Sequence, residues 1–273
     1  MTSTNLTYDS DQAENPFISE LKELFRYRDL VHQLIKRNIK TRYKRSFFGV
    51  LWTMLTPVLM TALFSLIFSQ FFKSNLPNFP VYVMSGYICW LFFVQTSSSA
   101  MSEIIWGGTL LNRIYVPPSA FIATALGASL IYLGFALIAL LGLMLITGKA
   151  FSWALLFLPV ALLIAAGFSI GVGLLLATLA VNFQDTLEMW GIVAQGLFFL
   201  TPIFYPADAV PNRLSLVRLN PCYYIIETFR FPFYHGMLAP KHIVITAAIS
   251  SVIALLLGWW AFTRKIHRTP YLV

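Results

Sequence analysis

Long apolar stretches separated by short polar ones dominate the chain from residue 50 onward. A helix needs about 20 apolar residues to cross a bilayer. The third and fourth stretches are long enough to tilt or to extend past the bilayer, whereas the fifth is short and ends in TPIFYP, whose two prolines stop a helix. The pattern predicts an all-α polytopic membrane protein whose six transmembrane helices are residues 50–71, 82–102, 119–147, 152–181, 189–206 and 242–263.

A different pattern precedes the first span. Between residues 16 and 43, apolar side chains recur every three or four positions and Lys and Arg occupy the other faces. A basic amphipathic helix of this kind lies in the membrane interface. We therefore expect a disordered N-terminus at 1–15, an amphipathic interface helix at 16–46 and a six-span domain at 47–273. The helix either only anchors the protein through anionic lipid or also contacts a partner, and both alternatives stay open.

Composition and charge agree with a membrane protein and give it an orientation. The chain is 58% hydrophobic and only 11% charged, which excludes a water-soluble domain. Its net charge of +8 does not indicate a nucleic-acid partner, because thirteen of the 19 Lys and Arg residues lie on the same side of the six spans as the N-terminus. By the positive-inside rule both termini are cytoplasmic. The first residues form no short apolar core behind a charged start, so a cleaved signal peptide is not expected.

Two connecting segments are predicted to be more than linkers. The inner segment 103–118 is semi-apolar and carries Arg113, which favours a short helix that contacts a cytoplasmic partner over a loop lying on the membrane surface. The outer segment 207–241 is too apolar for a solvated loop and too broken by proline for a span. It is predicted to be re-entrant, packed within protein, because irregular backbone cannot face lipid. Its Glu227 and Arg230 are three residues apart and can pair on one helical face.

The sequence contains no catalytic or metal-ligand constellation. The histidines are scattered, Cys89 and Cys222 imply neither a disulfide nor a metal site, and the span centres lack the acidic chains of proton-coupled pumps. Residues 142–149 (GLMLITGK) resemble a P-loop, but they have one residue too many between the glycines and no following Ser or Thr. We expect no cofactor and no enzymatic activity in this chain.

Aromatic residues make up 16% of the chain and gather on the first, second and fifth spans. Most such residues in membrane proteins form the core or the interfacial belts, but rings can also line a path for sugars. The candidates for such a path are Phe64, Phe68, Tyr87, Trp90, Phe198 and Phe199. A small-residue pattern at Gly167, Gly171 and Gly173 indicates close helix packing within the subunit or, alternatively, dimerisation.

Several motifs in this order resemble a known family. They are YRDL at 27–30, KTRYK at 40–44, FGVLW at 48–52 with Pro57, NRIYVP at 112–117, NFQD at 182–185, TPIFYP at 201–206 and NPxYxIIExxR at 220–230. In this order on six spans, the chain resembles the membrane subunits of type-2 ABC exporters, specifically the permeases for polysaccharides, O-antigen or teichoic acid.

The resemblance implies a homodimeric pore in a bacterial cytoplasmic (inner) membrane, with two cytoplasmic ATP-binding subunits that carry ATP and magnesium. It also implies a lipid-linked glycan as substrate. The surfaces that couple to the ATPase would include Arg37, Lys40, Arg42, Asn112, Arg113 and Tyr115. The outer gate would include Pro202, Tyr205, Pro206, Asn220, Pro221, Tyr224, Glu227 and Arg230.

Three other functions compete with this one. A permease of the same architecture could export drugs or lipids, although such proteins often have a larger outer region. A membrane-embedded transferase acting on lipid-linked sugars would need a polar catalytic cluster at one membrane face, which the sequence does not show. A passive scaffold would not need the two broken segments.

Overall fold

The computed structural model describes residues 16–44, 46–72, 76–111, 116–183, 185–207 and 216–266, and helices make up most of these residues. The elements are α1 (Pro16–Arg26), α2 (Arg28–Tyr43), α3 (Leu51–Phe72), α4 (Phe79–Leu111), α5 (Pro118–Ile146), the 3₁₀ helix η1 (Trp153–Phe157), α6 (Leu158–Asn182), α7 (Thr186–Leu200), α8 (Leu216–Leu219), α9 (Pro221–Tyr234) and α10 (Lys241–Ile266). Among the described residues no strand is present, as the apolar periodicity predicts.

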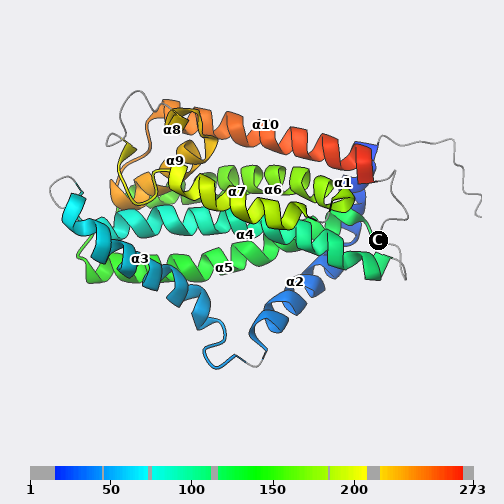
Figure 1. Cartoon of the computed structure of the whole chain (residues 1–273), viewed down its shortest axis with the longest axis horizontal. Coiled ribbons are helices and arrows are strands. Elements are labelled where there is room, and N and C mark those ends of the chain that lie inside the picture. Colours follow the sequence, from blue (N-terminus) through cyan, green and yellow to red (C-terminus); the bar gives the residue numbers. More distant parts are fainter. Residues whose placement is uncertain are drawn as a thin grey trace, which may run out of the picture.

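The long helices form a bundle with α4 at its centre (Figure 1). Helix α4 packs against α5 and α6, and α6 packs against α10. In an 18-residue window of its span Phe79–Ile105, 78% of the residues are buried, whereas in the 18-residue span of α3, Leu51–Phe68, 11% are buried. Helix α3 therefore leaves most of its apolar surface to lipid or to another protein.

Five described helical segments are long and apolar enough to cross a membrane: Leu51–Phe68, Phe79–Ile105, Pro118–Ile146, Trp153–Asn182 and Lys241–Lys265. They correspond to the first four predicted spans and the sixth. The predicted fifth span, 189–206, is instead the 15-residue apolar helix α7, which begins at Thr186 and ends at Leu200. Thr201 is already extended (φ −97°, ψ 130°), because a residue that precedes a proline is disfavoured in the helical region.

The predicted interface helix is two helices separated by Tyr27. Backbone hydrogen bonds from Tyr27 N to Glu23 O and from Val31 N to Tyr27 O continue across the break. Helix α2 packs on α5, where an added Cβ at Gly127 would lie 2.3 Å from the Ile35 Cδ1 atom. Farther along, α2 and α3 diverge from the bundle and meet in a short connection below it (Figure 1).

The small residues of α6 pack within the chain, as one of the two alternatives predicted. A Cβ added to Gly258 of α10 would lie 2.2 Å from the Gly171 carbonyl oxygen, and one added to Gly167 would lie 2.5 Å from the Ser251 hydroxyl. Gly173 faces Ala100 of α4 in the same way, at 3.0 Å. Glycine lets these helix backbones approach to a distance that any side chain would prevent.

Candidate functional site

Helix α9 begins where the sequence predicts a helix start. Asn220 accepts a hydrogen bond from Cys222 N at 3.0 Å, and Pro221 occupies the first turn, where its missing N–H costs nothing. The Asn220 amide also donates to the Thr201 hydroxyl at 2.8 Å. One side chain thus caps α9 and ties it to the end of α7.

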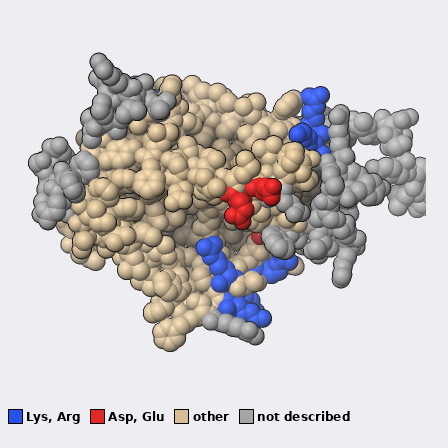
Figure 2. Space-filling view, viewed as in Figure 1, with Lys and Arg blue, Asp and Glu red and all other residues tan. Residues whose placement is uncertain are grey.

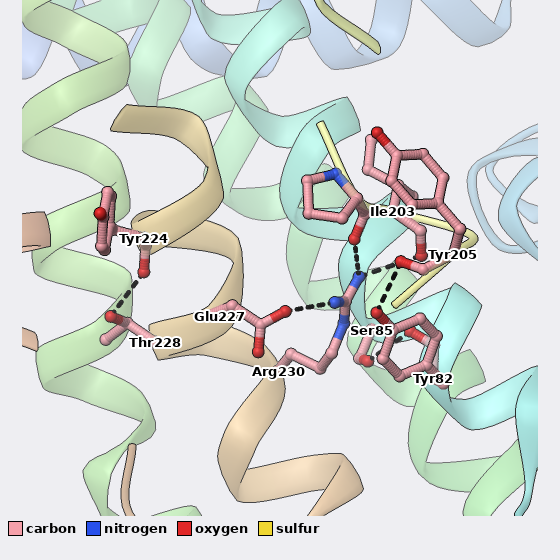
Figure 3. Close-up of polar contacts among 9 residues, drawn as sticks. Tyr82, Ser85, Ile203, Tyr205, Tyr224, Glu227, Thr228 and Arg230 are labelled. Carbon is pink, nitrogen blue, oxygen red and sulfur yellow. Dashed lines mark hydrogen bonds and ion pairs between the residues drawn. The ribbon is translucent and has the colours of Figure 1, made fainter. Parts of the chain in front are cut away.

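Arg230 lies at the centre of the site and is completely buried. Its Nη1 donates to the Glu227 carboxylate at 2.5 Å, and its Nη2 donates to the carbonyl oxygens of Pro202 and Ile203, each at 3.0 Å (Figure 3). The predicted pairing of Glu227 with Arg230 is confirmed. Because a buried charge is tolerated only when it is paired and hydrogen-bonded, all of these partners are needed to hold the guanidinium there.

Helix α4 supplies the other face of this site. The Arg230 guanidinium carbon lies 3.9 Å from the centre of the Tyr82 ring, and the Tyr82 hydroxyl donates to the Tyr205 carbonyl at 2.9 Å. Gly86 leaves the room that the guanidinium occupies, since an added Cβ would lie 2.2 Å from Nη2. We call this set the arginine latch: Tyr82, Gly86, Glu227, Arg230 and the backbone of 202–205. It joins α4, α9 and the segment after α7 through a single side chain.

The latch gathers several of the outer-gate candidates. Pro202, Tyr205, Glu227 and Arg230 belong to it, Asn220 joins it through Thr201, and Pro206 follows it in the chain. Tyr224 does not belong to it: it lies one turn before Thr228, away from Arg230 (Figure 3), and its hydroxyl donates to the Arg218 carbonyl at 2.8 Å. The sequence analysis missed Tyr82 and Gly86, because nothing in the sequence marks a contact with a residue about 150 positions later.

All six glycan-path candidates meet in one aromatic cluster. Phe204, which the candidate set omitted, lies in its middle and stacks on Phe64 at 5.4 Å with the ring planes 5° apart. Phe198 joins the cluster to α4, with ring centres 6.1 Å from Tyr87 and 5.9 Å from Trp90. Further ring contacts join Phe68 to Phe204, Phe199 to Phe198 and Phe204, and Phe64 to Phe68, Tyr87 and Phe198. The cluster is a wall of rings that α3, α4, α7 and the segment after α7 build together.

The coupling candidates on α2 lie on its exposed side. Arg37, Lys40 and Arg42 are exposed, and Figure 2 shows basic side chains gathered over α2 and at the end of α10. The Arg42 guanidinium carbon also lies 4.6 Å from the centre of the Tyr132 ring in α5. The other three candidates, Asn112, Arg113 and Tyr115, lie outside the described residues.

The described part of the chain holds no group of three or more His, Cys, Asp or Glu side chains that could bind a metal ion. Cys89 and Cys222 are free and buried. Burial raises the pKa of the Cys222 thiol to about 12, so it stays protonated. Burial, with the charges of Arg230 and Lys149, lowers the pKa of His235, which keeps its ring neutral at neutral pH.

Comparisons with known proteins agree with this architecture. The profile of the family described as ABC-2 type transporter matches residues 29–234, which run from the start of α2 to the end of α9. An O-antigen export system permease protein, RfbA of Myxococcus xanthus, is 30% identical over 246 residues, which cover 86% of this chain and 92% of RfbA.

Two further relatives are more distant. The RfbA of Klebsiella pneumoniae is 23% identical over 88% of this chain and 93% of its own length. The polysialic acid transport protein KpsM of Escherichia coli is 26% identical over 84% of this chain and 90% of its own length. Because the family profile spans α2, the aromatic cluster and the arginine latch alike, this chain is a multi-pass membrane protein that belongs to the ABC-2 type transporter family.

Proposed function

We propose that this chain is the permease subunit of an ATP-driven exporter that moves a lipid-linked polysaccharide across the bacterial cytoplasmic membrane. Two copies form the pore, and each binds one cytoplasmic ATP-binding subunit, which carries ATP and magnesium. The chain itself is not an enzyme. O-antigen-like glycans are the preferred substrate class, since the relatives that align over most of the chain are named for O-antigen and polysialic acid.

The observation that carries the proposal is the match of nearly the whole chain to polysaccharide-export permeases. The aromatic cluster supports it. Rings contact the C–H faces of sugars through weak dispersion forces that do not depend on the register of the chain. Such contacts suit a repetitive polymer that must slide, because tight binding at any one position would stop it.

Six spans with both termini in the cytoplasm complete the proposed topology, and α7 with the segment after it serves as the fifth span. The re-entrant part is α9, since it is only 14 residues long and most of its side chains are buried. The exposed apolar surface of α3, including Leu59, Leu63 and Leu66, is then available to the second copy or to lipid.

Movement would pass from the ATPase to the outer gate through packed elements. Helix α2 and the segment around Arg113 contact the ATPase and move with it. Helix α2 transmits this movement to the bundle through Leu34, which is buried among residues of α4, α5 and α6, and through Ile35 on Gly127 of α5. Helix α4 runs from that inner cluster to Tyr82 in the arginine latch. Opening the gate requires α9 and the 202–205 backbone to separate at Arg230.

The test is co-expression of the tagged chain with a cognate ATP-binding subunit, followed by purification in mild detergent, ATPase assay and export of labelled glycan from cells. We expect a complex with equal numbers of the two subunits that hydrolyses ATP and exports glycan. ATP hydrolysis with transport of lipid or drug but not glycan would refute the substrate class. A solitary chain without ATPase partner would refute the exporter as a whole.

A further inference from the structure

A cleft of about 150 Å³ lies between α2, α3, α4 and α5, on the side of the bundle where α2 and α3 diverge. Its polar lining comes from the end of α2 and from the middle of α4 and α5: Arg42, Tyr43, Gln95, Ser129 and Tyr132. Two threonines of α3 and an apolar wall that includes Trp52, Pro57, Leu91 and Leu133 complete it. No residue of the arginine latch or the aromatic cluster lines this cleft.

Two polar atoms of the cleft are buried without a hydrogen-bond partner, Gln95 Nε2 and Ser129 Oγ, and a third, Tyr43 Oη, has only the Thr53 hydroxyl beside it, outside ordinary hydrogen-bond geometry. Ser129 is 2% exposed, and a buried hydroxyl without a partner costs free energy. Several buried hydroxyls of the bundle donate to the carbonyl four residues earlier, as Thr124 does in the same helix at 2.8 Å, although those of Thr61, Thr96 and Ser119 also lack a partner. The Ser129 hydroxyl makes no such bond and can donate to a bound group.

The cleft is rich in hydrogen-bond donors and positively charged. Arg42 is its one charged lining residue in the described part of the chain, and no carboxylate lines it. Burial raises the pKa of Tyr43 above its usual value, so the phenol keeps its proton and can donate. The hydroxyl of the adjacent Thr53 already donates to the Val50 carbonyl at 2.6 Å. Donors around an arginine, with no acid opposite, fit the oxygens of a phosphate.

The walls of the cleft indicate that this phosphate is carried by a lipid. The cleft has room for a phosphate group and the first atoms of the chain that carries it. The cleft is bordered by α3, on which Leu59, Leu63 and Leu66 are between 51% and 77% exposed. A hydrocarbon chain can leave the cleft along that surface.

We propose that the cleft between α2, α3, α4 and α5 binds the phosphate group of an anionic membrane lipid. Arg42 contacts the charge, Gln95, Ser129 and Tyr43 donate hydrogen bonds, and the acyl chain lies along α3. A bound lipid would join the interface helix to the bundle next to the ATPase-facing surface. Binding of this lipid does not depend on the exported cargo.

The test measures binding of fluorescent phosphatidylglycerol to the full-length chain in neutral detergent, with unlabelled competitors. Phosphatidylglycerol should compete, and phosphatidylcholine should compete at least tenfold less well. Arg42→Gln should weaken binding about tenfold, as expected for loss of a charge-assisted contact, and Gln95→Leu should weaken it severalfold. Lys36→Gln, which removes an exposed charge of the same helix outside the cleft, should leave binding unchanged.

Competition by two further phosphates distinguishes the source of the ligand. If undecaprenyl phosphate competes as well as phosphatidylglycerol, the site accepts any lipid-borne phosphate. If it competes less well, the site is specific for phospholipid. Soluble glycerol phosphate that competes equally well would overturn the role of the lipid chain. Equal losses in Arg42→Gln and Lys36→Gln would reduce the effect to diffuse surface charge and overturn the site. Elution at the wild-type volume in gel filtration verifies that each variant is folded.

Discussion

Arg230 is both buried and charged, a combination that is rare among side chains. It is fully buried, yet its guanidinium reaches one carboxylate, two backbone carbonyls and the face of an aromatic ring. Lysine could not do the same, because a compact ammonium does not present donors in a planar fork. The surrounding backbone is therefore held by the geometry of a single group.

Removing that group should leave Glu227 buried without its partner. Arg230→Met is expected to lower the free energy of unfolding by about 3–5 kcal/mol, the range for breaking a buried ion pair. Thermal unfolding in detergent, followed by loss of the gel-filtration peak, measures the change. The double variant Glu227→Leu/Arg230→Met should recover part of the loss, and the exposed Arg218→Met serves as a control. A double variant no more stable than Arg230→Met would contradict the pairing.

A substitution at Gly86 tests the α4 side of the arginine latch. Gly86→Ala places a methyl group 2.2 Å from the Arg230 Nη2 atom, which already donates to the carbonyl oxygens of Pro202 and Ile203. The variant should unfold at a distinctly lower temperature than wild type despite the better helix propensity of alanine. Gly134→Ala in α5, where an added Cβ meets nothing within 4 Å, is the matched control and should be neutral or slightly stabilising. Equal behaviour of the two variants would contradict the close fit.

The sequence alone predicts half of the latch. The spacing of Glu227 and Arg230 indicates their pairing, because residues three apart on a helix are neighbours, and Asn220 before Pro221 indicates where α9 begins. The contacts with Tyr82, Gly86 and the carbonyls of Pro202 and Ile203 join residues far apart in the chain. They depend on how the helices pack, which local periodicity does not contain.

Helices α6 and α10 cross with their backbones in close contact. An added Cβ at Gly258 would lie 2.2 Å from a backbone oxygen of Gly171, and backbone cannot move aside as a flexible side chain can. Periodicity predicted these two helices well, because both are long and uniformly apolar. It predicted α7 and the α1–α2 segment less well, since their ends depend on Pro202 and on a bend at Tyr27 that no helix-breaking residue marks.

Gly258→Ala should therefore push α10 away from α6 and lower the unfolding temperature in detergent by several degrees. The control is Gly142→Ala in α5, where an added Cβ meets nothing within 4 Å. If this close packing stabilises only the fold of one chain, Gly258→Ala should not lower the fraction of cross-linked dimer more than it lowers the fraction of folded protein. A folded, fully stable and purely monomeric Gly258→Ala variant would instead assign the crossing to dimerisation.

At the scale of the whole molecule, the basic surface and the arginine latch lie in different parts of the bundle. The exposed Arg264 and Lys265 belong to the last turn of α10, at one end of the bundle, and further basic side chains lie over α2, below the bundle (Figure 2). The arginine latch lies toward the other end, with α8 and α9 (Figure 1). In the proposed exporter the first end meets the ATPase and the second opens outward.

This arrangement predicts that ATP hydrolysis can be uncoupled from glycan export. Arg113→Glu in the inner segment should leave the complex assembled and ATP hydrolysis near the wild-type rate while glycan export falls at least tenfold, because the ATPase would no longer push the bundle. ATPase assay of the purified complex and export assay in cells measure the two activities. Arg218→Glu, on the opposite end, is the charge-matched control for assembly. Normal export by Arg113→Glu would contradict the proposed coupling surface.

The shortness of α7 has a consequence for the bilayer itself. A helix of 15 residues is about 22 Å long at 1.5 Å per residue, whereas the hydrocarbon layer is about 30 Å thick. Where the segment after α7 does not extend the helix toward the far side, a bilayer that thins to match α7 is elastically deformed, and this deformation costs free energy for each ångström of mismatch. A polar polymer beside α7 would thus cross a locally thinner insulating layer. We expect transport to slow in reconstituted membranes made of longer-chain lipids.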